Sequence, residues 1–336
     1  MKHGIVLLLG DANVDTIMPV PEFPVPGRDG LATYYTVEVG GAVVNTAIML
    51  SKLGQPSKLI GSTGKDIWAE YISRNLADTR IDTSHLYPKP EGATGLTFII
   101  TTPDGERTMF CYRGANTLLN ADDITDSTFK NAKILHISGY ALLVSPQKEA
   151  VWHAVETAKK HGVEISLDTG LEPVIQNPHD LRALLPSVSV FISGRQEVMQ
   201  LLDCSTPQQA ADKLLSLGVK EAAIMMGKNG SLLADSDNRF LFPAFPVKAV
   251  DSTGAGDSFT AGLLFGGLNG LSLPVSGTLA GALGALAVMV YGAGFSLPDR
   301  DRVARFLDSM QENPAAGAFH KYIPEVLIAL REDDNP

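Results

Sequence analysis

Short apolar runs alternate along the chain with longer stretches of helical spacing. The apolar runs cover residues 5–9, 57–61, 134–137, 163–167, 188–192 and 222–226, and their length is typical of buried strands. Helical periodicity follows at 43–53, where Gly54 supplies the stop, and at 67–77. These repeated strand–helix units predict a mostly parallel sheet with helices on both faces. Ligands of such sheets bind at the carboxyl ends of the strands.

Two later helices carry their own start and stop signals. Ser145-Pro146 would begin one helix, and Gly162 would end it. Thr206-Pro207-Gln208-Gln209 has the form of a capping box with proline at the first helical position, and Gly218 supplies the stop.

Two extended segments do not fit this strand–helix alternation. Residues 94–101 and 107–112 alternate in strand fashion around a turn at 103–105, which predicts a hairpin. A further extended piece covers 31–39, just before Gly40-Gly41. We expect these pieces to form a small separate sheet; the other interpretation is a hairpin without a function.

Residues 258–298 contain no charged side chain, which superficially suggests membrane insertion. Asn269, Gly270, Ser272 and Pro274 interrupt the segment and leave pieces at 259–268 and 275–290. The first piece is too short to span a bilayer, and the second is marginal and rich in Gly and Ala. Two buried helices explain the segment better.

Size and charge narrow the class of protein. A chain of 336 residues with 45% hydrophobic and 19% charged residues is typical of one large, soluble α/β domain. The net charge of −10 argues against nucleic acid or an anionic membrane as a general partner. Cys111 and Cys204 form no disulfide framework or zinc spacing, and the N-terminal apolar run is too short for a secretion signal. We therefore expect a cytoplasmic protein, with a C-terminal tail at 313–336.

The most informative motif is the run from Val250 to Phe259, with Gly254-Ala255-Gly256-Asp257 at its centre. Two glycines let the backbone approach a ligand, and the helix that begins here offers unpaired N–H donors to an anion. A carboxylate among donors aimed at a phosphate suits a general base for phosphoryl transfer. A helix start capped by Asp257 without any ligand is the plainer alternative.

The sequence does not match two other glycine-rich motifs that bind nucleotides. A dinucleotide fingerprint would need glycine where Phe259 stands, which disfavours a nicotinamide-dependent dehydrogenase. A P-loop needs Ser or Thr after Gly-Lys, but Asp66 and Asn229 follow the two Gly-Lys pairs.

Polar residues near the N-terminus suit a sugar. Asn13 and Asp15 lie two apart after a strand, so both point to one side of an extended chain and could bond adjacent hydroxyls. Gly40 and Gly41 would let the backbone approach that ligand, and Asn45 would reach back from the next helix. A turn stabilised by Asn and Asp side chains is the alternative.

The combination of these motifs resembles the ribokinase-like (PfkB) carbohydrate kinases. The matches are 10–15, 39–47, 60–66, 227–230 and 251–262, in family order, within a stretch of about 4–310. The resemblance implies a ribokinase-like three-layer α/β/α fold in a single domain. A small β-sheet lid, formed by about 16–40 and 93–114, would close over the sugar. It further implies a homodimer joined through the lid.

The same resemblance implies ATP-dependent phosphorylation of a primary hydroxyl of a small sugar. Asp257 would be the general base, and the N–H groups of Gly254, Ala255 and Gly256 would stabilise the transferred group. Mg²⁺ must accompany ATP. The nucleotide would be held by Gly227, Lys228, Gly230, Thr253, Gly254 and Gly256. Asp251, with Thr253, is compatible with a monovalent cation such as K⁺.

Departures from the family pattern bear on the substrate. Arg113 is either a clamp on a substrate hydroxyl or carboxylate or a solvated strand end. Glu197 would order magnesium-bound water, although Gly194 replaces the usual asparagine. Residues 168–172 lack a second arginine, which favours a neutral sugar over a sugar acid, and an acidic residue that ribokinases use is missing near 138–140.

Two other functions stay open on this scaffold. A nucleoside kinase would need an aromatic base pocket, for which Phe23, Tyr34, Tyr35 and Phe98 are candidates. A catalytically silent sugar or nucleotide sensor is disfavoured because Asp257 and both glycines are present.

Overall fold

The computed structural model describes residues 4–103 and 107–331. Its larger sheet has the strand order β13-β12-β11-β10-β9-β8-β1-β4-β5 in the described part of the chain. The seven parallel strands are β1 (Ile5–Leu9), β4 (Ser57–Thr63), β5 (Ile81–Pro88), β8 (Ala132–Ser138), β9 (Glu164–Asp168), β10 (Val190–Gly194) and β11 (Glu221–Met225). The antiparallel hairpin β12 (Ser231–Ala234) and β13 (Arg239–Phe242) completes one edge.

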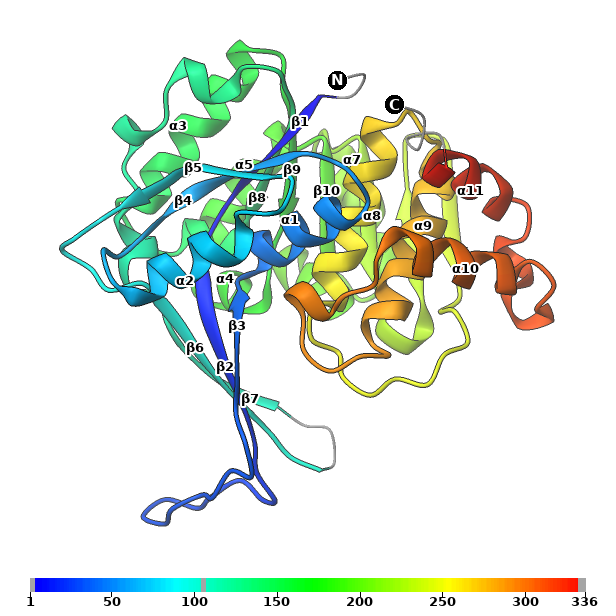
Figure 1. Cartoon of the computed structure of the whole chain (residues 1–336). Helices are drawn as coiled ribbons and strands as arrows, with labels where there is room; N and C mark the ends of the chain where they lie inside the picture. Colours follow the sequence, from blue (N-terminus) through cyan, green and yellow to red (C-terminus); the bar gives the residue numbers. More distant parts are fainter. Residues whose placement is uncertain (1–3, 104–106, 332–336) are drawn as a thin grey trace.

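Helices cover both faces of this sheet, so the molecule has three layers (Figure 1). One face packs on α1 (Ala42–Lys52), α2 (Ile67–Leu76), α8 (Ala255–Leu268), α9 (Leu273–Ala287), α10 (Arg300–Met310) and α11 (Ile323–Arg331). The other packs on α3 (Gln147–Lys160), α4 (Leu171–Gln176), α5 (Pro178–Leu184), α6 (Arg195–Leu202) and α7 (Pro207–Ser216). Successive side chains of β1 point to opposite faces of the sheet, so Leu8 packs in the core under the first set of helices and Leu7 in the core under the second. The expected three-layer α/β/α architecture is thereby confirmed.

The uncharged segment forms the paired helices α8 and α9, which are buried along most of their length. Gly262 allows their close approach, because a Cβ at this position would lie 2.5 Å from the Ala280 Cα. Within 4–103 and 107–331, no helix is long and apolar enough to cross a membrane. The interpretation as two buried helices is confirmed.

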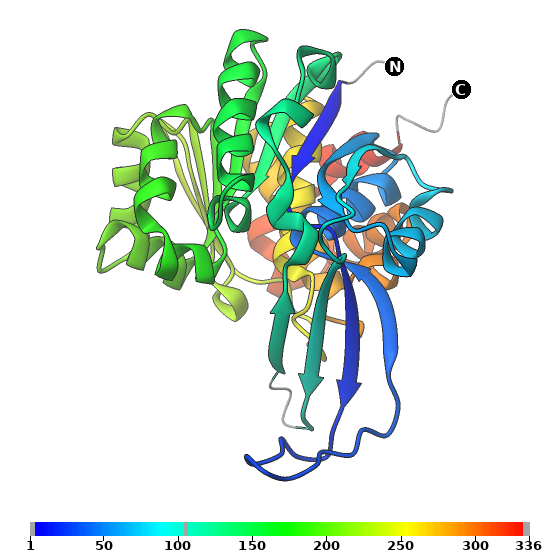
Figure 2. The same cartoon turned by 90° about the vertical axis from the view of Figure 1, so that its left-hand side faces the viewer.

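A smaller sheet projects from the main body (Figure 2). Its strand order is β3-β2-β6-β7, with β2 (Asn13–Pro19), β3 (Thr36–Gly40), β6 (Gly95–Thr101) and β7 (Arg107–Tyr112). We call this sheet the lid. The predicted hairpin is present as the antiparallel pair β6–β7, while residues 104 and 105 of its expected turn lie outside the described residues.

Strand register gives the lid two different faces. Asp15 lies opposite Glu38 and Thr97, and Thr97 lies opposite Cys111, so these four side chains share one face. We call this the inner face, because Arg107, two steps of two along β7 from Cys111, contacts the loop before α8 from it. The alternate positions form the outer face.

Some elements differ from expectation. Of the extended piece at 31–39, only the part from Thr36 onward pairs as a strand. Part of the expected C-terminal tail is folded: a 3₁₀ helix at Pro314–Phe319 and helix α11 pack on the main body, because Phe319, Leu327 and Leu330 are buried there. Residues 332–336 lie outside the described residues.

Candidate active site

Asp257 lies in the first turn of α8, where the glycine motif positions it. Gly254 has a φ of 73°, and a Cβ there would lie 2.8 Å from the Ala293 Cβ, so glycine is required. The first N–H groups of the helix cannot be paired within it. The Ala255 N–H donates to the Ser252 carbonyl oxygen at 3.3 Å. This turn is thus an anion-favouring helix start that carries its own carboxylate.

The Asp257 carboxylate is fixed by helix α1. Asn45 Nδ2 donates to Asp257 Oδ2 at 2.8 Å, and Thr46 Oγ1 donates to the Asp257 carbonyl oxygen at 3.3 Å. Burial raises the pKa of Asp257 to about 6, while the hydrogen bond from Asn45 and the charge of Arg107 counteract this rise. The carboxylate is therefore mostly ionised at pH 7, but its pKa lies close to the range that suits a base.

Asp15 faces Asp257 from the inner face of the lid. Burial raises the pKa of Asp15 to about 7, and the charges of Glu38 and Asp257 add to the rise against a hydrogen bond from Thr97. Its Oδ1 is buried without a hydrogen-bond partner among the described residues. A Cβ at Gly40 would collide with this carboxyl, which explains that glycine. An unpartnered buried acceptor beside Asp257 suits a hydroxyl-bearing ligand.

Of the remaining predicted sugar-side residues, one shapes the backbone and two are held by other side chains. Gly41 has a φ of 101°, and a Cβ at this position would lie 2.3 Å from the Asp11 carbonyl oxygen, so the backbone turn at the start of α1 requires glycine. Asn13 Oδ1 accepts a hydrogen bond from Asn116 Nδ2 at 2.8 Å. Arg113 forms a paired salt bridge with Asp11 instead of extending into solvent. Sequence reasoning missed Asp11 and Asn116, both of which are buried.

The loop before α8 is held in place by hydrogen bonds to the carboxylate of Asp251, and Arg107 of the lid contacts it. Asp251 Oδ1 accepts hydrogen bonds from Thr253 N (2.9 Å) and Oγ1 (2.7 Å), and Oδ2 accepts from Gly292 N at 2.8 Å. Arg107 Nη1 donates to Thr253 Oγ1 at 2.8 Å. A cavity of about 400 Å³ beside this contact is lined by Glu38, Arg107 and Asp251, among others. Arg107 was missed, although a period of two along β7 places it on the face of Cys111.

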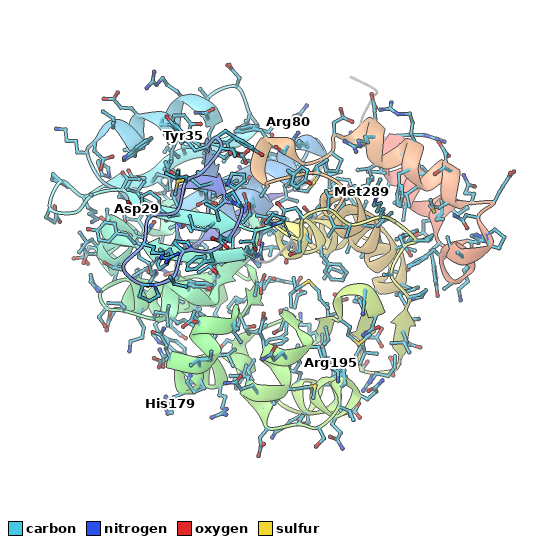
Figure 3. All side chains as sticks on the ribbon, turned by 90° about the horizontal axis from the view of Figure 1, so that it is seen from below. Asp29, Tyr35, Arg80, His179, Arg195 and Met289 are labelled. Carbon is cyan, nitrogen blue, oxygen red and sulfur yellow. The ribbon has the colours of Figure 1, made fainter. Side chains whose placement is uncertain are left out.

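An apolar cavity of about 590 Å³ lies on the other side of the same helix start. Its walls include Phe245, Val247 and Val288, and it reaches Ser252, Ala255 and Gly256. Three residues predicted to bind nucleotide, Gly227, Lys228 and Gly230, line it as well. Seen from below, Asp29 and Tyr35, between β2 and β3, lie on the left of the molecule, and Met289, just after α9, lies to their right (Figure 3). Gly256 thus borders the cavity one residue before Asp257.

Glu197 caps helix α6. Its Oε2 accepts from the Gly194 N–H (2.9 Å), Ser193 Oγ (3.1 Å) and Thr169 Oγ1 (3.2 Å). Asp168, next to Thr169, is deeply buried, and burial together with the charges of Glu197 and Asp257 raises its pKa well above the ordinary value. The described residues contain no group of three His, Cys, Asp or Glu side chains that could enclose a metal ion.

Comparison with known proteins gives a consistent result. Residues 5–300 match the family model described as pfkB family carbohydrate kinase. A 5-dehydro-2-deoxygluconokinase of Geobacillus thermodenitrificans is 29% identical over 82% of this chain and 86% of its own. One of Clostridium beijerinckii is 30% identical over 82% of this chain and 85% of its own.

Solved structures agree with these matches. A ribokinase of Thermotoga maritima superposes with a TM-score of 0.80 at 25% identity, covering 91% of this chain and 99% of its own. The ribokinase of Arabidopsis thaliana, solved with ribose and ATP, gives 0.78 at 25% identity over 90% and 98% of the two chains. An E. coli protein provisionally named ribokinase II, solved with ATP and Mg²⁺, gives 0.82 at 25% identity over 91% and 99%.

Proposed function

The chain belongs to the PfkB family of carbohydrate kinases, and we propose that it transfers the γ-phosphoryl group of ATP to a primary hydroxyl of a small sugar, with Asp257 as general base. One observation carries this proposal. Asp257 stands at a helix start between an unpartnered buried oxygen of Asp15 and an apolar cavity of about 590 Å³ that ends at Gly256. An alcohol on the Asp15 side and a nucleotide on the Gly256 side would meet at this carboxylate.

In the proposed step the Asp257 carboxylate accepts the proton of the sugar hydroxyl as its oxygen attacks the γ-phosphorus. The bond from phosphorus to the β,γ-bridging oxygen breaks, and ADP leaves. The N–H groups of Gly254 and Gly256 would stabilise the charge on the transferred group, whereas the Ala255 N–H, also expected to do so, donates to the Ser252 carbonyl oxygen. Mg²⁺ bound with ATP would neutralise phosphate charge. Such ions are usually held by one or two carboxylates together with the phosphates, and Glu197 would take this part through bound water.

We favour a sugar acid or its keto derivative over the neutral sugar expected from the sequence. That expectation depended on the absence of a second arginine after Asp168. Arg107 supplies a second guanidinium, which lines the cavity beside the inner face together with Thr36 and Glu38. The name 5-dehydro-2-deoxygluconokinase of the relatives supports the same class of substrate.

The nucleoside-kinase alternative loses one of its candidate residues. Phe98 follows Thr97 in β6, so it lies on the outer face of the lid and cannot line a base pocket on the inner face. Tyr35 is largely exposed, whereas Tyr34 lines the cavity beside the inner face.

The outer face instead supports the proposed homodimer. Phe98 lies opposite Phe110, and Tyr112 belongs to the same face; these side chains are 41%, 57% and 55% exposed. An apolar face of this kind usually marks an interface, and a two-fold axis would pair it with itself. A Phe110→Asp variant should sediment as a monomer at concentrations at which the wild-type protein sediments as a dimer.

The function is tested by ADP release over a panel of pentoses, hexoses, sugar acids (including 5-dehydro-2-deoxygluconate) and nucleosides. We expect activity with a sugar acid, and we expect Asp257→Asn to lose about 10²–10⁴-fold in kcat while retaining ATP binding. Wild-type turnover by Asp257→Asn would refute the general-base assignment. Absence of phosphoryl transfer to any sugar in the panel would refute the function.

A further inference from the structure

Arg113, Asp11 and Gln147 form a polar cluster where the lid joins the main body. Asp11 follows β1, Arg113 follows β7, and Gln147 is the first residue of α3. Asp11 and Gln147 are buried, and the Arg113 side chain is only 16% exposed. Three segments far apart in the sequence therefore meet around one guanidinium.

The hydrogen bonds of this guanidinium can be counted donor by donor. Arg113 Nε donates to Asp11 Oδ2 at 2.7 Å, and Nη2 donates both to Asp11 Oδ1 at 2.9 Å and to Gln147 Oε1. Gln147 Nε2 in turn donates to Asp11 Oδ1 at 2.9 Å. A guanidinium has five N–H donors, and the two left over are on Nη1. Nη1 is buried and has no partner among the described residues.

This arrangement limits what Arg113 can bind. An arginine grips a carboxylate with two parallel N–H bonds, using either Nε with Nη2 or Nη1 with Nη2. Asp11 takes the first pair, and Gln147 takes the second N–H of Nη2, which removes the other pair. The remaining group, Nη1, can donate its two N–H groups to ligand oxygens but cannot grip a carboxylate with two parallel bonds from two nitrogens. A buried charged donor without an acceptor is costly, so its presence points to an acceptor that a ligand supplies.

We propose that Gln147 is a positioning residue of this kinase: with Asp11 it fixes the Arg113 guanidinium so that only Nη1 meets the substrate, at carbonyl or hydroxyl oxygens. This inference rests on the proposed sugar-kinase function. Without Gln147, Nη2 regains a free N–H and the guanidinium is held from one side only. Substrate binding then weakens, while the transfer step at Asp257 is unaffected.

The test uses Gln147→Met, which keeps the length of the side chain and removes both hydrogen-bonding groups. ADP release is measured with 5-dehydro-2-deoxygluconate, or with the best sugar of the panel. We expect the KM for the sugar to rise about tenfold, with kcat within about twofold and the KM for ATP unchanged. Gln147→Glu keeps an acceptor for Nη2 but replaces the Nε2 donor to Asp11 Oδ1 by a carboxylate oxygen, so it should also raise the KM.

A matched control is Gln55→Met. Gln55 is also buried, and its Nε2 donates to backbone oxygens of Gly4 and Pro56, away from this cluster. Gln55→Met should lower the Tm and leave the KM for the sugar unchanged. A similar rise of KM in both variants would mean that Gln147 is merely structural and would overturn the inference.

A double-mutant cycle tests whether Gln147 acts through Arg113. In an Arg113→Ala background, Gln147→Met should add no further rise in KM. Additive effects, or an unchanged KM in the single Gln147→Met variant, would overturn the positioning role. Failure of the wild-type protein to phosphorylate any sugar would instead refute the proposed function, so the two failures can be told apart.

Discussion

Replacing Asn45 by leucine tests how helix α1 controls Asp257, the proposed general base. Asn45 Nδ2 donates to Asp257 Oδ2 at 2.8 Å and lowers the Asp257 pKa against the effect of burial. A hydrogen bond to a charged group contributes about 1.5–3 kcal/mol, which corresponds to about one to two pH units. Asn45→Leu removes this bond at nearly constant side-chain size, so the Asp257 pKa should rise by about that amount from its value of about 6.

The direction of the effect on activity follows from the role of Asp257. A general base must be ionised, so a higher pKa moves the acid limb of the kcat profile towards higher pH. With a pKa of about 6, about nine-tenths of Asp257 is ionised at pH 7; after a rise of one to two units, about half to one-tenth is. Activity at pH 7 should therefore fall about twofold to tenfold, and it should approach the wild-type value at pH 9.

The assay is kcat and kcat/KM from pH 5 to 9 under saturating Mg·ATP, with Asp257→Asn as the control that lacks the limb altogether. Asn45 is also a predicted sugar contact, so KM is followed separately. A loss of kcat that is equal at every pH, or an acid limb that stays in place, would refute the coupling between Asn45 and the Asp257 pKa.

Three further variants test neighbouring parts of the site. Asp15→Asn should stabilise the unliganded protein, because the folded-state pKa of about 7 lies above the ordinary 3.8 and the wild-type carboxyl therefore destabilises the fold as pH rises through this window. The gain, at most about 4 kcal/mol, should be absent at pH 4 and complete at pH 8 in thermal melts, with weaker sugar binding throughout. Equal melting shifts at both pH values would contradict it. Arg107→Ala removes a positive charge that lowers the pKa of Asp257, so the acid limb of the kcat profile should move towards higher pH. An unchanged acid limb would exclude this effect of Arg107 on Asp257. Gly281→Leu should fill the cavity beside Phe245 and raise the KM for ATP several-fold without changing that for the sugar; the reverse pattern would place the nucleotide elsewhere.

Much of the main sheet could be predicted because its central strands are buried on both sides. The run Ile5–Leu9 is uniformly apolar and bounded by glycine, and β1 lies at these residues. Edge strands gave a weaker signal. Strand β5 exposes Asp82 and Ser84, and β13 at the other edge has only four residues and exposes Arg239, so neither showed a continuous apolar run.

The site could be predicted only as far as local motifs reach. Gly254 to Asp257 form one turn, and their relation is set by the backbone. The pairing of Arg113 with Asp11 depends on how the lid joins β1, and Gln147 depends on where α3 begins. No spacing in the sequence encodes these contacts, since the partners are separated by 102 and 136 residues. Arg107 was within reach, but only after the register showed which lid face is the inner one.

Adjacent residues of a lid strand belong to its two opposite faces. Thr97 lies on the inner face, which carries the proposed sugar site, and Phe98, the next residue, lies on the apolar outer face, the proposed dimer surface. Because side chains alternate along a strand, inserting or deleting a single residue early in β6 would exchange these assignments, placing an aromatic ring over the substrate and a threonine at the association surface. If both proposals hold, catalytic selectivity and self-association would be lost together, so this strand can vary by substitution but not by a change in its length.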